Sequence, residues 1–289
     1  SVAAHVAEGN VVDLLVDGVN RLSLDLGAHP AIRAAQPVTV SVNRSSVLRV
    51  TLPPSGTLDL SSAGPGAWAL ADGPVPAEEK RAGFCGPMRD ALARPFAIVY
   101  GTQGADAALV AASYSMAQDA AKAWREWWWG VPRVVRDADV TPELMGSHNL
   151  LLFGGEFVNG VVAQLAAQMP FRDGRPCPLA PGVDPRDVAH KFIYPNPEAP
   201  GRYVVVMAAQ DPVALQAIGQ LGQKDPYPAP LGTLDVDYIV AVRRCIGSTV
   251  TLAPVAEGWF DNHWRFQPAA PGPMESTGRS WLASVSPQT

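Results

Sequence analysis

The 289-residue sequence lacks the short motifs that usually assign a chemistry. It contains no GxSxG, so the usual nucleophile turn of an α/β-hydrolase is absent. HExxH, HxH, GxGxxG and the GK[ST] of a P-loop are also missing. The three cysteines, Cys85, Cys177 and Cys245, are too far apart for a CxxC pair, which argues against a structural zinc site. One disulfide with a spare thiol stays open, and no reaction follows from motifs alone.

The sequence is also short of charge and of long apolar runs. Charged residues make up 17% and the formal net charge is -5, so electrostatics give no reason to expect nucleic acid or an anionic membrane as a partner. No apolar run approaches the length of a membrane span. Hydrophobic residues, at 47%, are enough for a sizeable folded core. The chain begins with Ser, so we take it as a mature form, a fragment or a trimmed chain.

Period-two patterns dominate residues 1–80. Apolar residues alternate with polar ones at Leu22, Leu24 and Leu26, and again through PVTVSVNRSSVLRVTLP (37–53). Such alternation predicts strands with one buried face. The polar NRSS at 43–46 predicts a hairpin loop, and TLDLSS and GAWALADG predict two further short strands. We expect a small β-rich, sandwich-like domain over residues 1–80.

The pattern changes after a polar, proline-bearing joint at 74–84, PVPAEEKRAGF. Predicted strands at 96–100, 133–135, 150–154, 191–195, 203–209 and 237–241 now alternate with predicted helices near 105–127, 156–167 and 212–222. Strands separated by helices favour βαβ crossovers and a mostly parallel sheet. We therefore expect residues 83–268 to form a three-layer α/β domain of the Rossmann or flavodoxin type, followed by an irregular tail at 269–289.

Two glycine turns follow predicted strands of this domain. Their residues are Gly101, Thr102, Gln103 and Gly104 in the first turn, and Gly154, Gly155 and the nearby Asn159 in the second. In open parallel sheets, ligands bind outside the carboxyl ends of the strands, and N–H groups at a helix start can hold an anion. Both turns are therefore candidate ligand-binding turns, with plain structural turns as the alternative.

Carboxylates gather in RDADVTPE at 136–143. Asp137, Asp139 and Glu143 offer the oxygen ligands that a hard cation such as calcium prefers. Asp137 also lies near the usual acidic position of a dinucleotide site. The alternative is structural, because Thr141 followed by Pro142 is typical of a helix start. The sequence identifies no cofactor, and calcium is the one cation that it suggests.

Other chemically versatile residues have structural interpretations as well. His148 and His190 precede their predicted strands, which is the wrong end for a site in a parallel sheet. The three tryptophans at 127–129 close a predicted helix, where they serve a core or an interface, or alternatively a sugar platform. Asp235 and Asp237 in LDVD pose the same choice between cation ligand and turn residue.

Several segments together resemble a known family. KRAGFCGPMRDALARPFAIVYGT (80–102), NLLLFG (149–154) and GWFDNHW (258–264) resemble a C-terminal region of large bacterial proteins that carry an α/β-hydrolase domain of the esterase or prolyl-oligopeptidase type. The matching positions are Lys80, Gly83, Gly86, Pro87, Asp90, Tyr100, Gly101, Thr102, Asn149, Phe153, Gly154, Phe260 and Asp261. In that family the hydrolase nucleophile lies in an upstream domain, so the resemblance implies a hydrolase context rather than a catalytic role for this region.

The resemblance implies a secreted or periplasmic setting and an upstream hydrolase domain as partner. The first functional expectation is an accessory α/β module that assists ester cleavage. The second is a stand-alone hydrolase of small-molecule esters or lactones, with glycine-turn amides as oxyanion donors and a carboxylate-held cation or another base. The third is a Rossmann-type nucleotide or sugar binder. None of the three assigns a catalytic residue.

Overall fold

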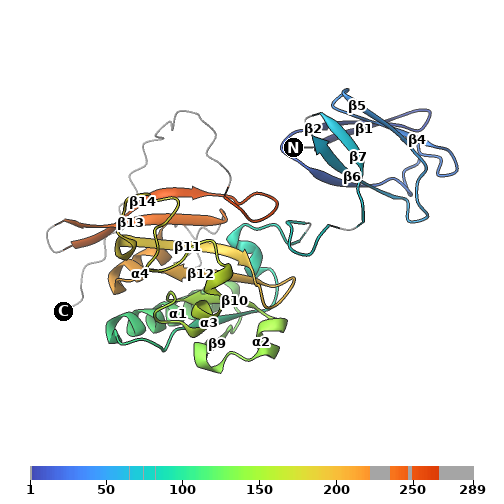
Figure 1. The fold of residues 1–289 in the computed structure, drawn as a ribbon. Helices are drawn as coiled ribbons and strands as arrows, with labels where there is room; N and C mark the ends of the chain where they lie inside the picture. The colour runs from blue at the N-terminus through green and yellow to red at the C-terminus, as the bar shows by residue number, and fades with distance from the viewer. Residues whose placement is uncertain are drawn as a thin grey trace. The chain divides into compact units, whose positions relative to one another are not determined.

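The computed structural model describes residues 2–64, 66–73, 75–81, 83–221, 235–246 and 249–266 (Figure 1). The chain divides into two compact units, Ser1–Pro74 and Val75–Thr289. The division falls at the start of the joint expected at 74–84. The irregular tail expected at 269–289 lies outside the described residues.

The described part of the smaller unit consists of two β-sheets. One sheet has the order β1 (Val2–Ala7), β2 (Val11–Val16), β4 (Val38–Val42), β5 (Ser46–Val50), and the other has the order β3 (Arg21–Asp25), β6 (Thr57–Gly64), β7 (Ala67–Leu70). Val38, Val40 and Val42 are fully buried while their neighbours on β4 are partly exposed, which is the alternation that the sequence pattern predicts. They share one hydrophobic cluster with Leu60 and Trp68 from the second sheet.

The hairpin loop predicted at 43–46 is confirmed, since β4 pairs with β5 antiparallel on either side of it. Asn43 and Arg44 take positive φ values of 50° and 57°, the backbone geometry that tight hairpins need. The Asn43 amide also donates to the Val16 carbonyl at 2.9 Å and accepts from the Val16 N–H at 2.7 Å. The turn residue therefore ties the hairpin to β2.

The described part of the larger unit is built on a seven-stranded mixed sheet with the order β14-β13-β11-β12-β10-β8-β9. The strands are β8 (Phe96–Tyr100), β9 (Arg133–Arg136), β10 (Asn149–Phe153), β11 (Val188–Pro195), β12 (Tyr203–Ala208), β13 (Tyr238–Ile246) and β14 (Thr249–Gly258). Strands β9, β8, β10 and β12 are mutually parallel. The pairs β12–β11, β11–β13 and β13–β14 are antiparallel.

The prediction of a three-layer Rossmann- or flavodoxin-like fold with a mostly parallel sheet is therefore wrong. Among the described residues, strand exceeds helix, 36% against 23%, and the strands form three sheets, of which the largest is mixed. The physical reason lies in the connections. No helix separates β11 from β12 or β13 from β14, and parallel neighbours need a crossover of a dozen residues or more.

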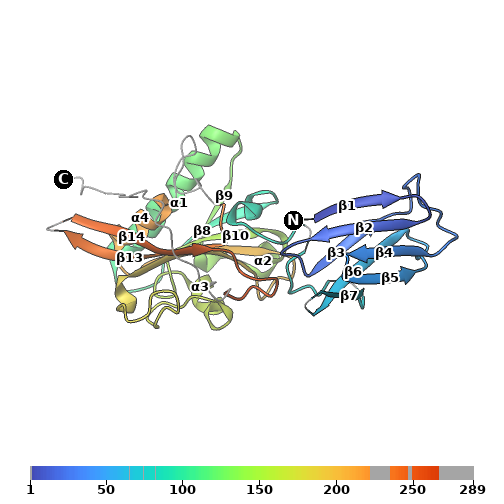
Figure 2. The same ribbon diagram turned by 90° about the horizontal axis from the view of Figure 1, so that it is seen from above.

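Helices occur in the stretches that the sequence predicts. α1 (Ala107–Trp128) and α4 (Pro212–Gln220) lie together on one face of the sheet, and the short α3 (Gly160–Leu165) lies on the other (Figure 2). α1 begins where the Asp106 carboxylate accepts N–H bonds from Ala108 and Leu109. The remaining helical elements are α2 (Pro142–Ser147) and the 3₁₀ turns η1 (Met88–Leu92), η2 (Asp137–Asp139), η3 (Ala166–Gln168) and η4 (Pro185–Asp187).

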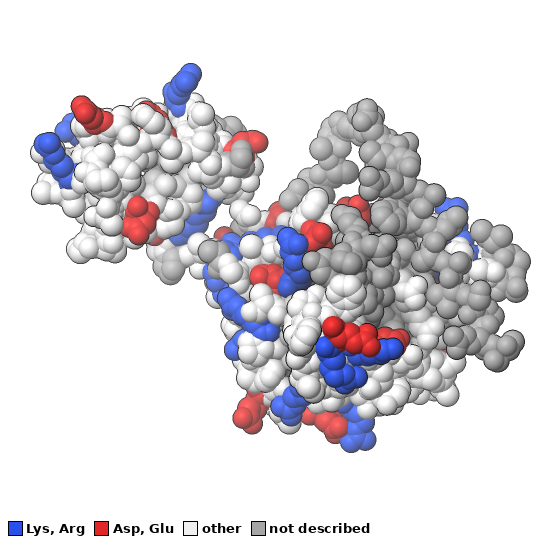
Figure 3. All heavy atoms as spheres, turned by 180° about the vertical axis from the view of Figure 1, so that it is seen from behind, with Lys and Arg blue, Asp and Glu red and all other residues white. Residues whose placement is uncertain are grey.

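Two surface features bear on partners. Positive and negative side chains are interspersed on the face drawn in Figure 3, which gives nucleic acid no continuous basic surface there. Among the described helices, none combines the length and the apolar character needed to cross a membrane.

A lysine lies in the core of the larger unit. Lys191 on β11 is 0% exposed, and its amine donates to the Leu221 carbonyl at 2.6 Å, just beyond the end of α4. Burial lowers the pKa of the Lys191 amine to about 7, against a weaker opposing effect of Glu257. The folded protein therefore binds fewer protons than the unfolded chain above neutral pH.

We expect the free energy of unfolding to rise with pH just above neutrality, by up to about 1.4 kcal/mol per pH unit, because only the unfolded chain then keeps Lys191 protonated. Urea titrations at intervals between pH 7 and pH 8 measure this slope, because most thiols and phenols of the unfolded chain are still protonated in this range. Lys191→Met should flatten the slope and stabilise the protein at pH 7. An unchanged slope in Lys191→Met would show that the amine stays charged in the fold.

Candidate functional site

The two predicted glycine turns lie side by side at the carboxyl edge of the parallel strands. Gly101 follows β8 and Gly154 follows the neighbouring β10. The Gln103 N–H donates to the Val158 carbonyl at 2.8 Å, so the first turn binds the loop after the second. A Cβ at Gly101 would collide with that same carbonyl, and a Cβ at Gly104 with the carbonyl of Phe157. These glycines let one protein loop approach another.

Asp137 fills the position between the turns. The Asp137 residue is 5% exposed, and its carboxylate accepts four hydrogen bonds. The donors are Thr102 N–H (3.1 Å), Thr102 O–H (2.5 Å), Ala138 N–H (2.9 Å) and Gly160 N–H (2.7 Å). Gly160 is the first residue of α3, where a carboxylate is favourable. The Asp137 carboxylate therefore occupies the position at the start of α3 where an external anion would otherwise bind.

The other predicted residues of this region are also bonded internally. Asn159 is fully buried, accepts N–H bonds from Val161 and Val162 as the cap of α3, and donates to the Phe153 carbonyl at 3.0 Å. The Gly101 N–H donates to the Ser113 hydroxyl at 2.9 Å, and the Gly154 N–H donates to the Met207 carbonyl at 3.0 Å. A ligand oxyanion would have to displace these bonds. Ligand binding by the turns stays a prediction, and the geometry supports the structural alternative.

The three carboxylates suggested for calcium lie in three different environments. Asp137 points into the turn region, and Asp139 forms a bidentate pair with Arg136 at 2.7 and 3.0 Å. Glu143 is exposed in the first turn of α2, which Thr141 caps as the sequence predicts. Among the described residues, no group of three or more His, Cys, Asp or Glu side chains is arranged to hold a metal ion. Calcium stays a prediction without a ligand set.

A depression opens near the start of β11, in a place that the sequence did not indicate. Its interior has about 10 Å³ of space, enough for one water molecule. Its lining residues are Phe171, Arg172, Asp173, Arg175, Cys177, Pro185, Val188 and His190. His190 pairs with Ala208 at the end of β12. Because β11 is antiparallel to β12, the start of β11 lies at the carboxyl edge, so the objection to His190 from a parallel sheet does not apply.

Two ionisable groups in the depression are strongly perturbed. Burial raises the pKa of the Asp173 carboxyl to about 6. The hydrogen bond from the Glu156 N–H (2.8 Å) lowers this pKa, and the nearby Glu156 charge raises it further. Burial lowers the pKa of the His190 imidazole to about 4, so this ring is neutral at physiological pH. Arg172 is held by Glu156 through bonds of 2.7 and 2.9 Å. Perturbed groups in a concavity are the usual mark of a functional site.

The second glycine turn takes part in this site indirectly. The Asp173 carboxylate lies over Gly155, where a Cβ would overlap it. The same carboxylate accepts from the N–H of Glu156, the next residue. Gly155, predicted as a ligand contact, therefore makes room for an acidic side chain of the depression.

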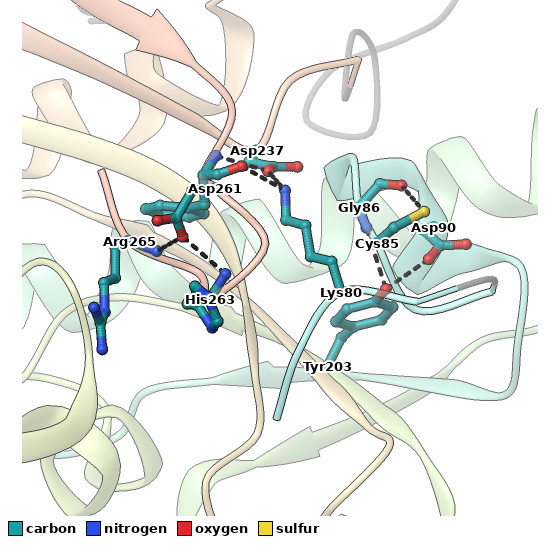
Figure 4. Close-up of polar contacts among 10 residues, drawn as sticks. Lys80, Cys85, Gly86, Asp90, Tyr203, Asp237, Asp261, His263 and Arg265 are labelled. Atoms are coloured by element: carbon teal, nitrogen blue, oxygen red, sulfur yellow. Dashed lines mark hydrogen bonds and ion pairs between the residues drawn. The ribbon is translucent and has the colours of Figure 1, made fainter. Parts of the chain in front are cut away.

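A third cluster surrounds a buried ion pair between Lys80 and Asp237 (Figure 4). The Lys80 amine lies 2.5 Å from Asp237 Oδ2 and donates to the Phe260 carbonyl at 2.9 Å. Asp237 is fully buried, and its Oδ2 also accepts the Phe260 N–H at 2.9 Å. The Lys80 amine stands 4.7 Å from the centre of the Trp264 ring, a favourable cation–π contact. The pair joins the chain before β8 to the chain around β13 and after β14.

Gly86 and Tyr203 extend this cluster. The Tyr203 hydroxyl accepts the Gly86 N–H at 3.2 Å and donates to Asp90 Oδ2 at 2.6 Å. A Cβ at Gly86 would collide with Asp237 Oδ1, so only glycine fits there. Asp237 Oδ1 and the Trp264 indole N–H are buried without a hydrogen-bond partner among the described residues. Cys85 lies beside this cluster and is exposed as a residue. Partial burial of its thiol nevertheless raises the thiol pKa, which disfavours a reactive thiolate.

Lys80, Gly86, Asp90 and Phe260 are residues that carry the resemblance described above, and the fold brings them together. The chain matches no family model and no curated protein. The resemblance therefore stands on its own sequence pattern, and the clustering shows only that the pattern residues support one another.

Asp137→Ala should lower the free energy of unfolding by about 2–3 kcal/mol, because it removes the charged acceptor of four partly buried hydrogen bonds. Urea denaturation followed by tryptophan fluorescence measures the loss. Asp139→Ala, two residues away and paired with an exposed arginine, is the matched control and should leave the midpoint almost unchanged. Equal midpoints for the two variants would contradict a structural role for Asp137.

Lys80→Met should destabilise the protein by about 3–5 kcal/mol, because it leaves Asp237 buried without a counter-charge. Adding Asp237→Asn to Lys80→Met should recover a large part of the loss, since the amide can still accept the Phe260 N–H. Arg89→Met, which breaks an exposed pair with Asp235, provides the control and should have little effect. Additive losses in the double variant would rule out coupling between Lys80 and Asp237.

Proposed function

We propose that the chain is a non-catalytic accessory module that works with a bacterial ester-cleaving hydrolase in a secreted or periplasmic setting. The observation that carries this proposal is that the protein's own groups occupy the backbone N–H donors at the carboxyl edge of the parallel strands. Asp137 and the two loops use the amides of Gly101, Thr102 and Gly160, which are the groups that a hydrolytic site there would aim at an oxyanion.

The Lys80–Asp237 cluster supports the same proposal. Its polar atoms are mostly bound to one another, and Lys80 is 11% exposed while Asp237 is 0% exposed. Groups so enclosed hold chain segments in place and are poorly placed to meet a substrate. The hydrolase context itself comes from the sequence resemblance.

A stand-alone hydrolase of esters or lactones is the second candidate. Asp173 and His190 favour it, because a carboxyl with a pKa of about 6 and a neutral imidazole line the same depression. The water-sized interior weighs against it, since an ester substrate needs more room. The nucleotide or sugar binder loses its main argument, because the Rossmann-type fold on which it depended is not present.

The test is hydrolysis of p-nitrophenyl butyrate, an acyl-homoserine lactone and a feruloyl ester by the purified chain, with calcium and with EDTA. We expect no turnover above buffer in either condition. Turnover that His190→Gln and Asp173→Asn remove would establish the hydrolase instead. Turnover lost only with EDTA would point to a cation. The genomic DNA that adjoins the coding region should also encode a GxSxG hydrolase, in frame or in a neighbouring gene, and its absence would contradict the accessory role.

A further inference from the structure

The depression near the start of β11 carries polar groups that the fold leaves unpaired. Arg175 is exposed at its rim and forms no hydrogen bond or ion pair with the described residues. His190 is 5% exposed, and its ring stacks on Phe171 at 5.2 Å without a hydrogen bond from either nitrogen to a described residue. The Asp173 Oδ2 atom accepts the Glu156 N–H, whereas Oδ1 accepts no hydrogen bond from any residue that the structure describes.

Polar groups that make no hydrogen bond with the described residues can bond a ligand in the concavity, and His190 and Arg175 both have N–H donors to offer. The interior has room for one oxygen-sized atom, and the rim presents a guanidinium. A carboxylate fits both features, since one oxygen can enter toward the neutral imidazole and the other can bind the guanidinium.

We propose that this depression binds a small carboxylate. Arg175 supplies the positive charge, His190 donates an N–H hydrogen bond, and Asp173 permits binding only when its own carboxyl group is protonated. Ionised Asp173 repels the bound anion, whereas protonated Asp173 donates a hydrogen bond to it. That the natural ligand is the acid released by ester cleavage rests on the proposed function, whereas the carboxylate site itself does not.

The charges around Asp173 determine the direction of the pH effect. The Arg172 and Glu156 side chains neutralise each other through their paired bonds. The imidazole of His190 stays neutral above pH 5, and burial raises the pKa of the Cys177 thiol, so that thiol is uncharged as well. The depression therefore has no net charge when Asp173 is ionised and one positive charge when it is protonated. With a carboxyl pKa of about 6, carboxylate binding weakens as pH rises.

Sodium acetate is the probe, and chemical shifts of the backbone amides at 171–177 and 188–190 report its binding to the ¹⁵N-labelled chain. Binding that requires protonated Asp173 should weaken about 25-fold between pH 5.5 and pH 7.5. Acetamide, which has the same shape without the charge, should not shift these amides. Shifts of equal size with acetamide would overturn the carboxylate assignment.

Three variants separate the roles. Arg175→Gln should weaken acetate binding at pH 5.5 more than tenfold, whereas Arg125→Gln, at an exposed arginine of α1, should leave it unchanged. Asp173→Asn keeps an acceptor for the Glu156 N–H and should bind acetate equally at both pH values. Normal binding in Arg175→Gln, or a pH dependence that survives Asp173→Asn, would overturn the proposal. Because acetate is not hydrolysed, this result is independent of the ester-cleavage assay.

Discussion

Residues 196–202 join β11 to β12, and this connection is too short for a crossover helix. It closes on itself, because the Asn196 N–H donates to the Arg202 carbonyl at 2.8 Å and the Arg202 N–H to the Ala199 carbonyl at 3.0 Å. β11 must therefore run against β12. This reversal brings His190 to the carboxyl edge of the parallel strands. It also lets β11 receive β13 on its other side, where the Ile193 N–H donates to the Asp237 carbonyl at 2.8 Å.

Most elements of the larger unit could be predicted from the sequence, because their signals are local. Apolar runs mark β8, β10 and β12, and the caps of α1 and α2 can be read within four residues. Strand direction is not local. The direction depends on whether a helix separates two strands, and residues 196–202 between β11 and β12 contain no helix. The sequence pattern does not predict β14, because Pro254 interrupts its apolar run, although an edge strand tolerates proline.

The candidate site shows a different limit of sequence reasoning. A glycine in a turn or an irregular segment indicates that another group approaches the backbone closely, but it does not identify that group. At Gly101 it is the Val158 carbonyl, at Gly155 the Asp173 carboxylate, and at Gly86 the Asp237 carboxylate. Each partner lies far along the chain or in an irregular loop without periodicity. Asp173 in particular stands in FRDG (171–174), which reads as an ordinary polar turn, and only its burial against Gly155 distinguishes it.

Two sets of polar residues in the larger unit thus serve different ends. Lys80, Gly86, Asp90 and Phe260 contact a common network, which joins the segments before β8 and after β14 to the sheet. Asp173, Arg175 and His190 lie outside that pattern, keep unpaired atoms and line a depression. A shared scaffold fixes a fold and leaves its function to particular sites. Among the described residues of the larger unit, we therefore look for ligand chemistry in the second set and assign the first set to the stability of the fold.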